Sequence, residues 1–339
     1  MIRTSKQEIP WIHMVRVVAC VMVVMLHALP PLGEMAIKGF DRLFYQVVFV
    51  YTRPCVPLFF MITGFLILPY KEDNPLMFYK KRIPRVFFPL MIWGIIYAIL
   101  PWVLGMYDYK EMMMELILSP IKPPGLIGGI LWYLFILIGV YLAIPFFNKE
   151  IYHNKKMVEF FLLIWMVSSI AVVLRSWYPD LLGMVIIHNV DLTLYFSGYL
   201  GFVFLGLYLK EYESPIQSGG AFCMYIILFV VTILLPAISN KFLSFGAVIM
   251  TFCTFVLLSQ VKVNSNSQIY RLIKTISRYS FGIYLSQMLI YRLFTYNLYL
   301  LYGTTWWIQI IVMLSTFVLT LFLVKLLSLV PNSKYIIGC

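Results

Sequence analysis

The sequence has few charged residues for a chain of its length. Only 12% of its 339 residues are charged and 62% are hydrophobic, whereas a soluble globular chain carries about 25% charged and about 45–50% apolar residues. The chain also contains 27 Phe, 24 Tyr and 8 Trp, which excludes a disordered or collagen-like protein. The composition therefore predicts a polytopic membrane protein.

Cysteine pairs and the common metal-binding and catalytic motifs are also missing. The five cysteines form no CxxC pair, and Cys20, Cys55, Cys223 and Cys253 lie in apolar runs, which excludes a secreted disulfide scaffold. No cluster of His, Cys and Glu has the spacing of metal ligands, and neither a GxSxG nor a Walker-type motif occurs. We therefore expect no metal ion in the function of this protein.

Long apolar runs between polar breaks fill nearly the whole chain. A bilayer core of about 30 Å needs roughly 20 apolar residues per helix, and no soluble domain or long linker separates the runs. The sequence therefore predicts one all-α integral-membrane domain over residues 1–339, with about ten transmembrane helices. The candidate runs are 11–30, 45–69, 86–104, 130–147, 157–174, 192–209, 221–237, 243–260, 279–299 and 306–328.

Lys and Arg residues are distributed unevenly between the predicted loops. With the N-terminus in the cytoplasm, the inner segments hold 17 of the 26 Lys and Arg residues, and the outer segments hold six. Because cytoplasmic loops are enriched in Lys and Arg, both termini are predicted to be cytoplasmic, in a multi-pass protein of the plasma (inner) membrane. The net charge of +12 is then explained by Lys and Arg residues that set the topology beside the membrane lipids. A nucleic-acid partner is therefore excluded.

The first predicted helix contains two ionisable residues, Arg16 and His27. A charged side chain in the hydrocarbon region costs roughly 2.5–3.5 kcal/mol on insertion scales, so each one requires a reason. Their spacing corresponds to about three turns and about 16 Å of helix, so both side chains project from one face. One interpretation is a snorkelling Arg16 and an interfacial His27. The other is a polar stripe across the membrane, with a substrate between the two residues.

Two further candidates lie toward the predicted outer side. Arg53 precedes Pro54 and Pro57, which leave helix carbonyl groups unpaired, and such backbone is tolerated only where protein or water surrounds it. Arg53 is expected at the depth of His27, although an interfacial anchor is the alternative. Asp191 begins the sixth predicted span, where it either orients an acceptor hydroxyl or is a solvated loop end. Arg53 and Asp191 are therefore candidates for an acceptor site.

The segment FYKKRIPRVFFP at 78–89 concentrates four cations, Lys80, Lys81, Arg82 and Arg85. A positive-inside anchor is one interpretation of this cluster. The other is an anion site, because Arg presents its donors in a fork that fits phosphate oxygens. Coenzyme A, which carries a 3′-phosphate and a diphosphate, is a ligand that such a site could hold at the cytoplasmic surface.

Several of these patterns occur together, in an order that is typical of one family. They are Arg16-x10-His27, VPLFFMITGFL at 56–66, Arg82-x-x-Arg85, LWYL at 131–134, YFSGYLGFVFLGLYL at 195–209 and SRYSFGIYLSQMLI at 277–290. With them the chain resembles acyltransferase family 3, a family of integral-membrane acyltransferases, over roughly residues 11–325. Within the family it looks most like the bacterial branch that O-acetylates surface polysaccharides.

The resemblance implies transfer of an acyl group, usually acetyl, from cytoplasmic acyl-CoA to a hydroxyl of a cell-envelope glycan or glycolipid. It implies that His27 is the essential histidine, that Arg16 is its paired arginine, and that Arg82 and Arg85 form the second arginine motif. One position departs from the family pattern. Gln287 stands where family members commonly have His, and glutamine can form a hydrogen bond but cannot take a proton.

The residues and the resemblance agree on a role for His27. A sugar hydroxyl needs a base whose pKa lies near 7, and histidine is the side chain nearest that value. His27 could deprotonate the acceptor directly or first accept the acetyl group as an acyl-imidazole, and both routes stay open.

The alternative function is a transporter or flippase for an anionic or glycan-type solute, which would also use intramembrane Arg and broken helices. A non-enzymatic sensor or scaffold is a third class, but it would not need the stripe of Arg16 and His27. Against transport, the sequence shows no paired halves and no intramembrane carboxylates for ion coupling.

The predicted orientation can be tested by labelling. Cysteine substituted for Glu111, in an outer segment, should react with an impermeant thiol reagent in intact cells. Cysteine substituted for Glu72, in an inner segment, should not, because the bilayer shields it. Cell lysis should make position 72 reactive and serves as the control. Labelling at 72 but not at 111 in intact cells would establish the opposite orientation.

Overall fold

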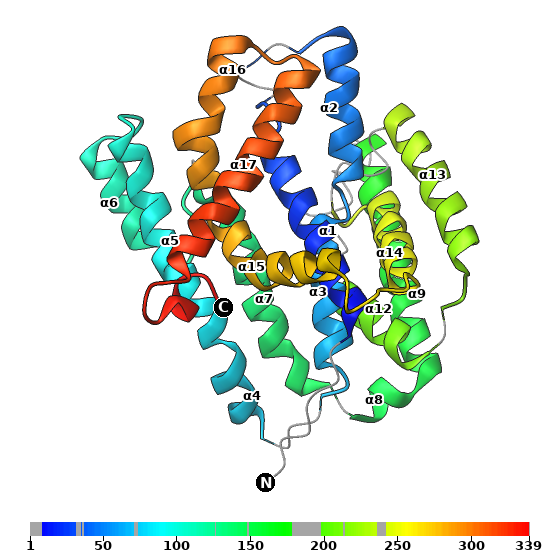
Figure 1. Cartoon of the computed structure of the whole chain (residues 1–339). Coiled ribbons are helices and arrows are strands. Elements are labelled where there is room, and N and C mark those ends of the chain that lie inside the picture. The colour runs from blue at the N-terminus through cyan, green and yellow to red at the C-terminus, as the bar shows by residue number, and fades with distance from the viewer. Residues whose placement is uncertain are drawn as a thin grey trace.

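The computed structural model describes residues 9–338 except 32–34, 36, 71–73, 126, 148, 178–197, 213 and 236–241. Every regular element within these ranges is helical (Figure 1). The elements labelled η are short 3₁₀ helices, apart from η4, which is a π-helix. In chain order the elements are α1 (Pro10–His27), α2 (Gly39–Tyr51), α3 (Cys55–Ile67), α4 (Pro75–Arg82), α5 (Pro84–Val103), α6 (Tyr109–Leu118), η1 (Gly128–Leu131), α7 (Trp132–Ala143), η2 (Ile144–Phe146), α8 (Lys149–His153), α9 (Lys155–Trp177), α12 (Leu200–Glu211), α13 (Ser218–Leu234), α14 (Phe245–Ser259), α15 (Gln268–Ile290), η4 (Tyr291–Thr295), α16 (Tyr296–Tyr302), α17 (Trp306–Leu327) and η5 (Ser333–Tyr335).

Some of these helices are long and apolar enough to cross a membrane. By length and composition, five stretches of the described chain qualify: Pro10–His27, Gly39–Ile67, Pro75–Val103, Gly128–Phe146 and Trp306–Leu327. The helices α13 and α14 are apolar but shorter. The predicted all-helical membrane class is therefore confirmed for the described residues, whereas the number of about ten crossings and the orientation of the termini stay predictions.

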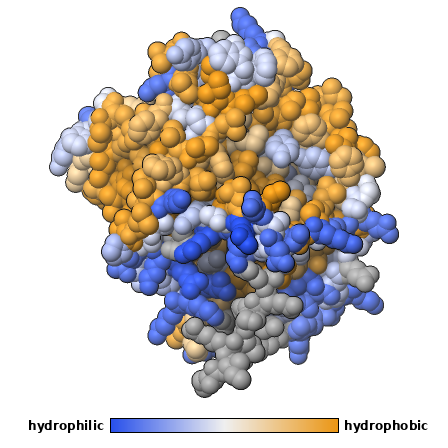
Figure 2. Space-filling model, viewed as in Figure 1, coloured by the Kyte–Doolittle hydropathy of each residue, from blue (hydrophilic) through white to orange (hydrophobic). Residues whose placement is uncertain are grey.

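The outer surface of the helices suits lipid rather than water. On α17, Leu314, Val318 and Phe322 are each at least 60% exposed, while Thr316 and Thr320 on the opposite face are buried. Figure 2 shows hydrophobic residues over most of the upper part of one face, with hydrophilic residues gathered across its lower half. Apolar surface of this extent is rare on monomeric soluble proteins. The pattern is therefore that of a membrane-embedded region with a polar end.

The predicted second span, 45–69, is divided into two helices. α2 ends at Tyr51 and α3 begins at Cys55, with Arg53 and Pro54 in the turn between them. The side-chain hydroxyl of Thr52 donates to the carbonyl of Phe49 at 3.0 Å. This bond gives the Phe49 carbonyl a partner at the end of α2, where the backbone hydrogen bonds of the helix stop. Proline lacks a backbone N–H, so a break near this position was expected. The turn carries Arg53 to a buried position, with 5% of its surface exposed.

α3 and α12 approach each other at two reciprocal glycines. A Cβ atom on Gly64 would lie 1.8 Å from the carbonyl oxygen of Val203, and one on Gly206 would lie 2.1 Å from the carbonyl oxygen of Met61. No real Cβ atom tolerates such distances to backbone, so this pairing requires glycine at both positions. Small residues are the usual means of close helix packing in membranes, where apolar surface alone gives no preference for protein over lipid.

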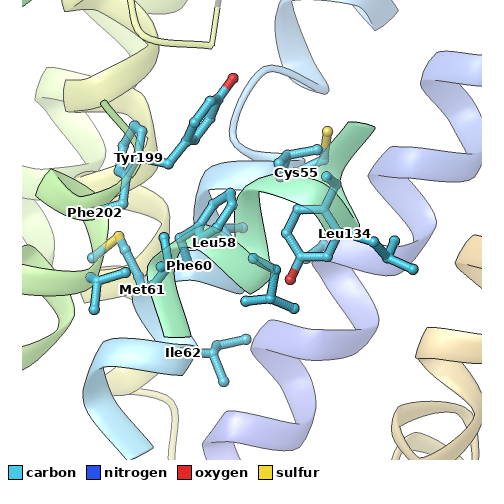
Figure 3. Packing of buried hydrophobic residues seen from close by; sticks show 14 of the residues in the cluster. Cys55, Leu58, Phe60, Met61, Ile62, Leu134, Tyr199 and Phe202 are labelled. Atoms are coloured by element: carbon cyan, nitrogen blue, oxygen red, sulfur yellow. The ribbon is translucent and has the colours of Figure 1, made fainter. Parts of the chain in front are cut away.

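α3 also forms part of the main hydrophobic core (Figure 3). Its buried side chains include Leu58 and Phe60, and the Phe60 ring lies 4.9 Å from the ring of Tyr199 and 5.0 Å from that of Tyr133 on α7. α3 is therefore packed against protein along most of its length, and its buried first turn follows directly on the turn that carries Arg53.

α15 begins earlier than the apolar pattern predicted. It starts at Gln268, eleven residues before the expected boundary at 279, and the side chain of Ser267 accepts a hydrogen bond from the N–H of Tyr270 at 3.1 Å. The added turns carry Arg271 and Arg278 on exposed surface, so a search for continuous apolar runs does not detect them. The first part of α15 crosses α1, against which it packs (Figure 1).

The glycine contact gives a prediction about stability. Gly206→Ala should lower the thermal unfolding temperature of the detergent-solubilised protein, because the new methyl group must push α3 away from α12. Overpacking of this kind typically costs about 1–3 kcal/mol. Gly139→Ala is the matched control, since that helical glycine has no atom within 4 Å of the added Cβ. Equal unfolding temperatures for the two variants would contradict the close packing of α3 and α12.

Candidate active site

His27 is the last residue of α1, and two tyrosines hold the backbone just beyond it. The hydroxyl of Tyr299 donates to the carbonyl of Ala28 at 2.8 Å, and that of Tyr291 donates to the carbonyl of Leu29 at 3.3 Å. The last carbonyl groups of a helix have no partner within the helix, so these bonds satisfy groups that would otherwise be buried and unpaired. The imidazole is therefore carried on anchored backbone.

The imidazole of His27 contacts Gln287 of α15. His27 Nδ1 and Gln287 Nε2 are 2.9 Å apart, and Gln287 is 1% exposed. Gln287 Oε1 has no hydrogen-bond partner among the described residues. A glutamine amide can present either its N–H₂ group or its oxygen to the ring, so Gln287 can pair with either neutral tautomer. Gln287 holds the ring through Nδ1, and the His27 side chain is only partly buried. Nε2 is therefore the ring nitrogen that can act on a substrate.

Arg53 is a cation on the same side of the protein as His27. Its Nε donates to the carbonyl of Phe49 at 3.3 Å, and its guanidinium lies 3.6 Å from the centre of the Phe49 ring and 5.2 Å from that of Phe242. Arg53 acts electrostatically on His27, which agrees with the expected similar depth. A cation in this place can stabilise negative charge on a reacting oxygen. Asp191, the second acceptor candidate, lies outside the described residues.

A cavity of about 300 Å³ lies nearer the other end of α1. It is lined by four arginines: Arg16 from α1, Arg82 from the end of α4, Arg85 from the start of α5 and Arg278 from α15. The described lining contains no Asp or Glu. The fold thus brings both arginine motifs of the sequence to one space, and the uncompensated charge makes that space attractive to anions.

One arginine of this cavity presents a hydrogen-bond donor without a partner among the described residues. Arg82 Nε is buried and has no hydrogen-bond partner among the described residues. Arg16, Arg82 and Arg85 all act electrostatically on the buried Tyr141, so the three guanidinium groups surround one region. Because a buried donor without a partner costs free energy, an anion that accepts from Arg82 would stabilise the site.

Lys80 and Lys81, the other two cations of that segment, are exposed. They are not part of the cavity lining. The segment therefore separates into two arginines that face the cavity and two lysines that face away from it.

The cavity ends before it reaches His27. Its deep wall includes Tyr133 and Tyr284, and the hydroxyl of Tyr284 donates to the carbonyl of Ile130. Tyr284 lies three residues before Gln287 on α15, which corresponds to about 4.5 Å along the helix axis. The structure therefore forms two centres, an arginine cavity and the pair of His27 with Gln287, and about one helical turn separates them.

Sequence reasoning missed two contributors to the cavity. Arg278 lies in the segment 277–290 that carries the family resemblance, but it is not among the predicted site residues. The signal that could have found it is that Ser277, Tyr284 and Gln287 recur beside it at helical spacing. The C-terminal tail also lines the cavity through Gly338. It is held against α5 by a 2.9 Å bond from Trp93 Nε1 to the carbonyl of Ile336, and no sequence signal indicated this contact.

A metal site is not formed by the described residues, since no group of three or more His, Cys, Asp or Glu side chains lies close enough together among them. The two described centres contain an imidazole, an amide and several guanidinium groups.

Comparison with known proteins identifies the family. The profile of a family described as an acyltransferase domain matches residues 9–325, nearly the whole chain. The chain belongs to acyltransferase family 3. No curated protein and no solved structure matches it. The match confirms the family that the motifs indicated and an acyltransferase activity in general, whereas the polysaccharide branch stays a prediction.

The position of His27 predicts a specific loss of activity in this acyltransferase. His27→Ala should lower the rate of acyl transfer by about 10²–10⁴-fold, the usual contribution of a general base, while the protein still folds and inserts. Initial rates of the purified variant measure the effect. His153→Ala, which changes an exposed histidine of α8, should keep the parent rate. A His27→Ala protein with more than about a tenth of the parent rate would exclude the base role.

The contact between Gln287 and His27 gives a second prediction. Gln287→Leu keeps a side chain of similar size but leaves Nδ1 without a partner, so the imidazole loses the contact that orients it. We therefore expect its rate to fall about tenfold or more, with normal yield and unfolding temperature. Gln287→His should retain most of the activity, since histidine can also pair with Nδ1. Complete inactivation by Gln287→His would instead show that the amide itself is required.

Proposed function

We propose that this acyltransferase moves an acetyl group from cytoplasmic acetyl-CoA to a hydroxyl of a cell-envelope glycan or glycolipid, within the inner membrane of a bacterial cell. The observation that carries the proposal is the cavity in which Arg16, Arg82, Arg85 and Arg278 converge. Arg16 belongs to the same helix that ends at His27. One helix thus connects a site for a polyanionic donor with a base for the acceptor.

The cavity fits the chemistry of the donor. Guanidinium groups bind phosphate oxygens in pairs, and the diphosphate of acetyl-CoA would satisfy the unused donor of Arg82. Beyond the arginines, the lining becomes aromatic and apolar, with Phe59, Leu137 and Tyr284, which suits the slender, uncharged pantetheine arm. Lys80 and Lys81 are exposed and lie outside this lining, where they act as anchors at the membrane surface.

His27 performs the transfer in either of two balanced ways. In the direct route, Nε2 takes the proton of the acceptor hydroxyl as its oxygen attacks the thioester carbonyl, the C–S bond breaks, and the thiolate of coenzyme A receives the proton. In the other route, Nε2 attacks the thioester carbonyl first, the C–S bond breaks, and the coenzyme A thiolate leaves with the proton of Nδ1. The acceptor hydroxyl then takes the acetyl group from the acyl-imidazole and returns its proton to the ring. In both routes Gln287 holds Nδ1, and Arg53 stabilises the negative charge of the tetrahedral intermediate.

Two measurements test this proposal against transport of an anionic solute, which an arginine-lined cavity would also suit. Purified protein in liposomes should release free coenzyme A from acetyl-CoA when envelope glycan is added, as followed with a thiol-reactive dye. Mass analysis of envelope glycans should show acetyl esters that disappear when the protein is removed from the cell. If coenzyme A is not released and glycan acetylation does not change, the acetyltransferase proposal is wrong.

If Arg82 and Arg85 bind the donor, acetyl-CoA affinity should depend on the geometry of their hydrogen-bond donors as well as on their charge. Arg82→Lys and Arg85→Lys keep the charge but lose paired donors, so each should raise the Michaelis constant for acetyl-CoA several-fold or more. A charge-assisted hydrogen bond is worth roughly 1.5–3 kcal/mol, and the exposure of Arg85 will reduce its share. The Michaelis constant for the acceptor should change little, because the acceptor is expected on the opposite side of the membrane.

Lys80→Ala is the control for this pair of variants. It removes a charge from an exposed side chain that does not line the cavity, and it should leave the Michaelis constant for acetyl-CoA near the parent value. If Lys80→Ala weakens donor binding as much as Arg82→Lys does, the segment acts through its summed charge and the donor site must lie elsewhere.

A further inference from the structure

A second cavity, of about 630 Å³, lies against the early turns of α15. Arg271, Lys274 and Arg278 line it, and their spacing places them along one face of the helix. Its lining also includes Arg16 and His13 and contains no Asp or Glu. Figure 2 shows hydrophilic residues gathered over the region where α15 begins in Figure 1. The cavity is therefore an open, strongly basic depression at the polar end of the protein.

The two cavities are adjacent and share lining residues. Arg16, Ser277 and Arg278 line both of them, so the space around Arg278 has two arms, one bounded by Arg82 and Arg85 and the other by Arg271. A ligand that fills both arms must carry two anionic groups joined by a short connection.

Size also argues that the donor extends beyond the first cavity. At about 300 Å³, that cavity is at the lower end of the range of about 300–1,000 Å³ that holds drug-sized ligands. Coenzyme A is larger than such ligands, and it carries its 3′-phosphate and its diphosphate on different carbons of one ribose. The first cavity alone cannot enclose the pantetheine arm, the diphosphate and the adenosine together.

We propose that the cavity along α15 is the subsite for the adenosine 3′-phosphate of the donor, with Arg271 and Lys274 binding the 3′-phosphate. This inference rests on the proposed function, in which acetyl-CoA is the donor. Arg278 then lies between the 3′-phosphate and the diphosphate and contacts both. A phosphate monoester carries about −1.5 to −2 charges at neutral pH, which suits a basic lining without carboxylates, and Tyr279 in the same lining provides an aromatic face for the adenine.

An anionic lipid headgroup is the other source of phosphate at such a surface. A lipid would occupy the α15 cavity without extending into the first cavity. It would also be indifferent to the presence of a 3′-phosphate on the donor. These two differences separate the sources by experiment.

The test measures the equilibrium binding of acetyl-CoA and of acetyl-3′-dephospho-CoA to the purified full chain in discs of neutral lipid, without an acceptor. The parent protein should prefer acetyl-CoA by roughly tenfold, which corresponds to about 1.4 kcal/mol. In the double variant Arg271→Gln and Lys274→Gln, acetyl-CoA should bind only as well as the dephospho donor, whose affinity should stay near the parent value. Lys262→Gln removes an exposed charge just before α15 and outside both cavities, and it should keep the full preference.

Each contrary result has a definite meaning. A double variant that keeps the parent preference for the 3′-phosphate overturns the inference, as does a parent protein without any preference. The inference is also overturned if the preference is lost in Arg82→Lys but not in the double variant, since the 3′-phosphate then lies in the first cavity. If the double variant differs from the parent only in discs that contain anionic lipid, the α15 cavity binds lipid headgroups. Failure of the parent to bind either donor would instead refute the proposed function itself.

Discussion

The pairing of α1 with α15 is the contact on which both described centres depend. The two helices run in the same direction, and polar side chains meet near both ends of the contact. His13 Nδ1 lies 2.9 Å from the hydroxyl oxygen of Ser277, and His27 Nδ1 lies 2.9 Å from Gln287 Nε2. Arg16 of the arginine cavity lies between these two contacts on α1. A shift of α15 by one residue would therefore separate the imidazole from its amide and change the shape of the basic cavities at the same time.

Apolar packing holds this pair together, and the polar contacts determine its register. Cys20 and Val24 of α1 are buried against Ile283 of α15 and Val324 of α17. Hydrogen bonds between membrane helices contribute only about 0.6 kcal/mol on average, so the histidine contacts alone would not bind the helices. Their geometric requirement is strict, however, and apolar side chains permit many alternative arrangements. The site is thus positioned by weak but directional bonds within a contact that is mainly hydrophobic.

The sequence predicted those parts of the fold that depend on local pattern. α1, α5 and α17 are long and apolar, so composition located them, and the prolines near Arg53 indicated the break between α2 and α3. The early start of α15 was missed because its charged residues lie on an exposed face, where an amphipathic helix tolerates them. In the site, spacing placed Arg16 and His27 on one face of a helix. That Arg278 joins the other arginines depends on how α15 crosses α1, which no local pattern contains.

The separation of the two centres constrains the mechanism that we propose. Arg16 and His27 are about 16 Å apart along one helix, a distance that an extended arm can bridge but that direct contact between the residues cannot. Tyr284 forms the wall between them, one turn before Gln287. The thioester can reach the imidazole only if this wall moves, so donor entry must precede chemistry. His27 lines neither basic cavity, so in the proposed reaction the donor itself must bring its thioester past Tyr284, and only a bound donor places the thioester beside the base.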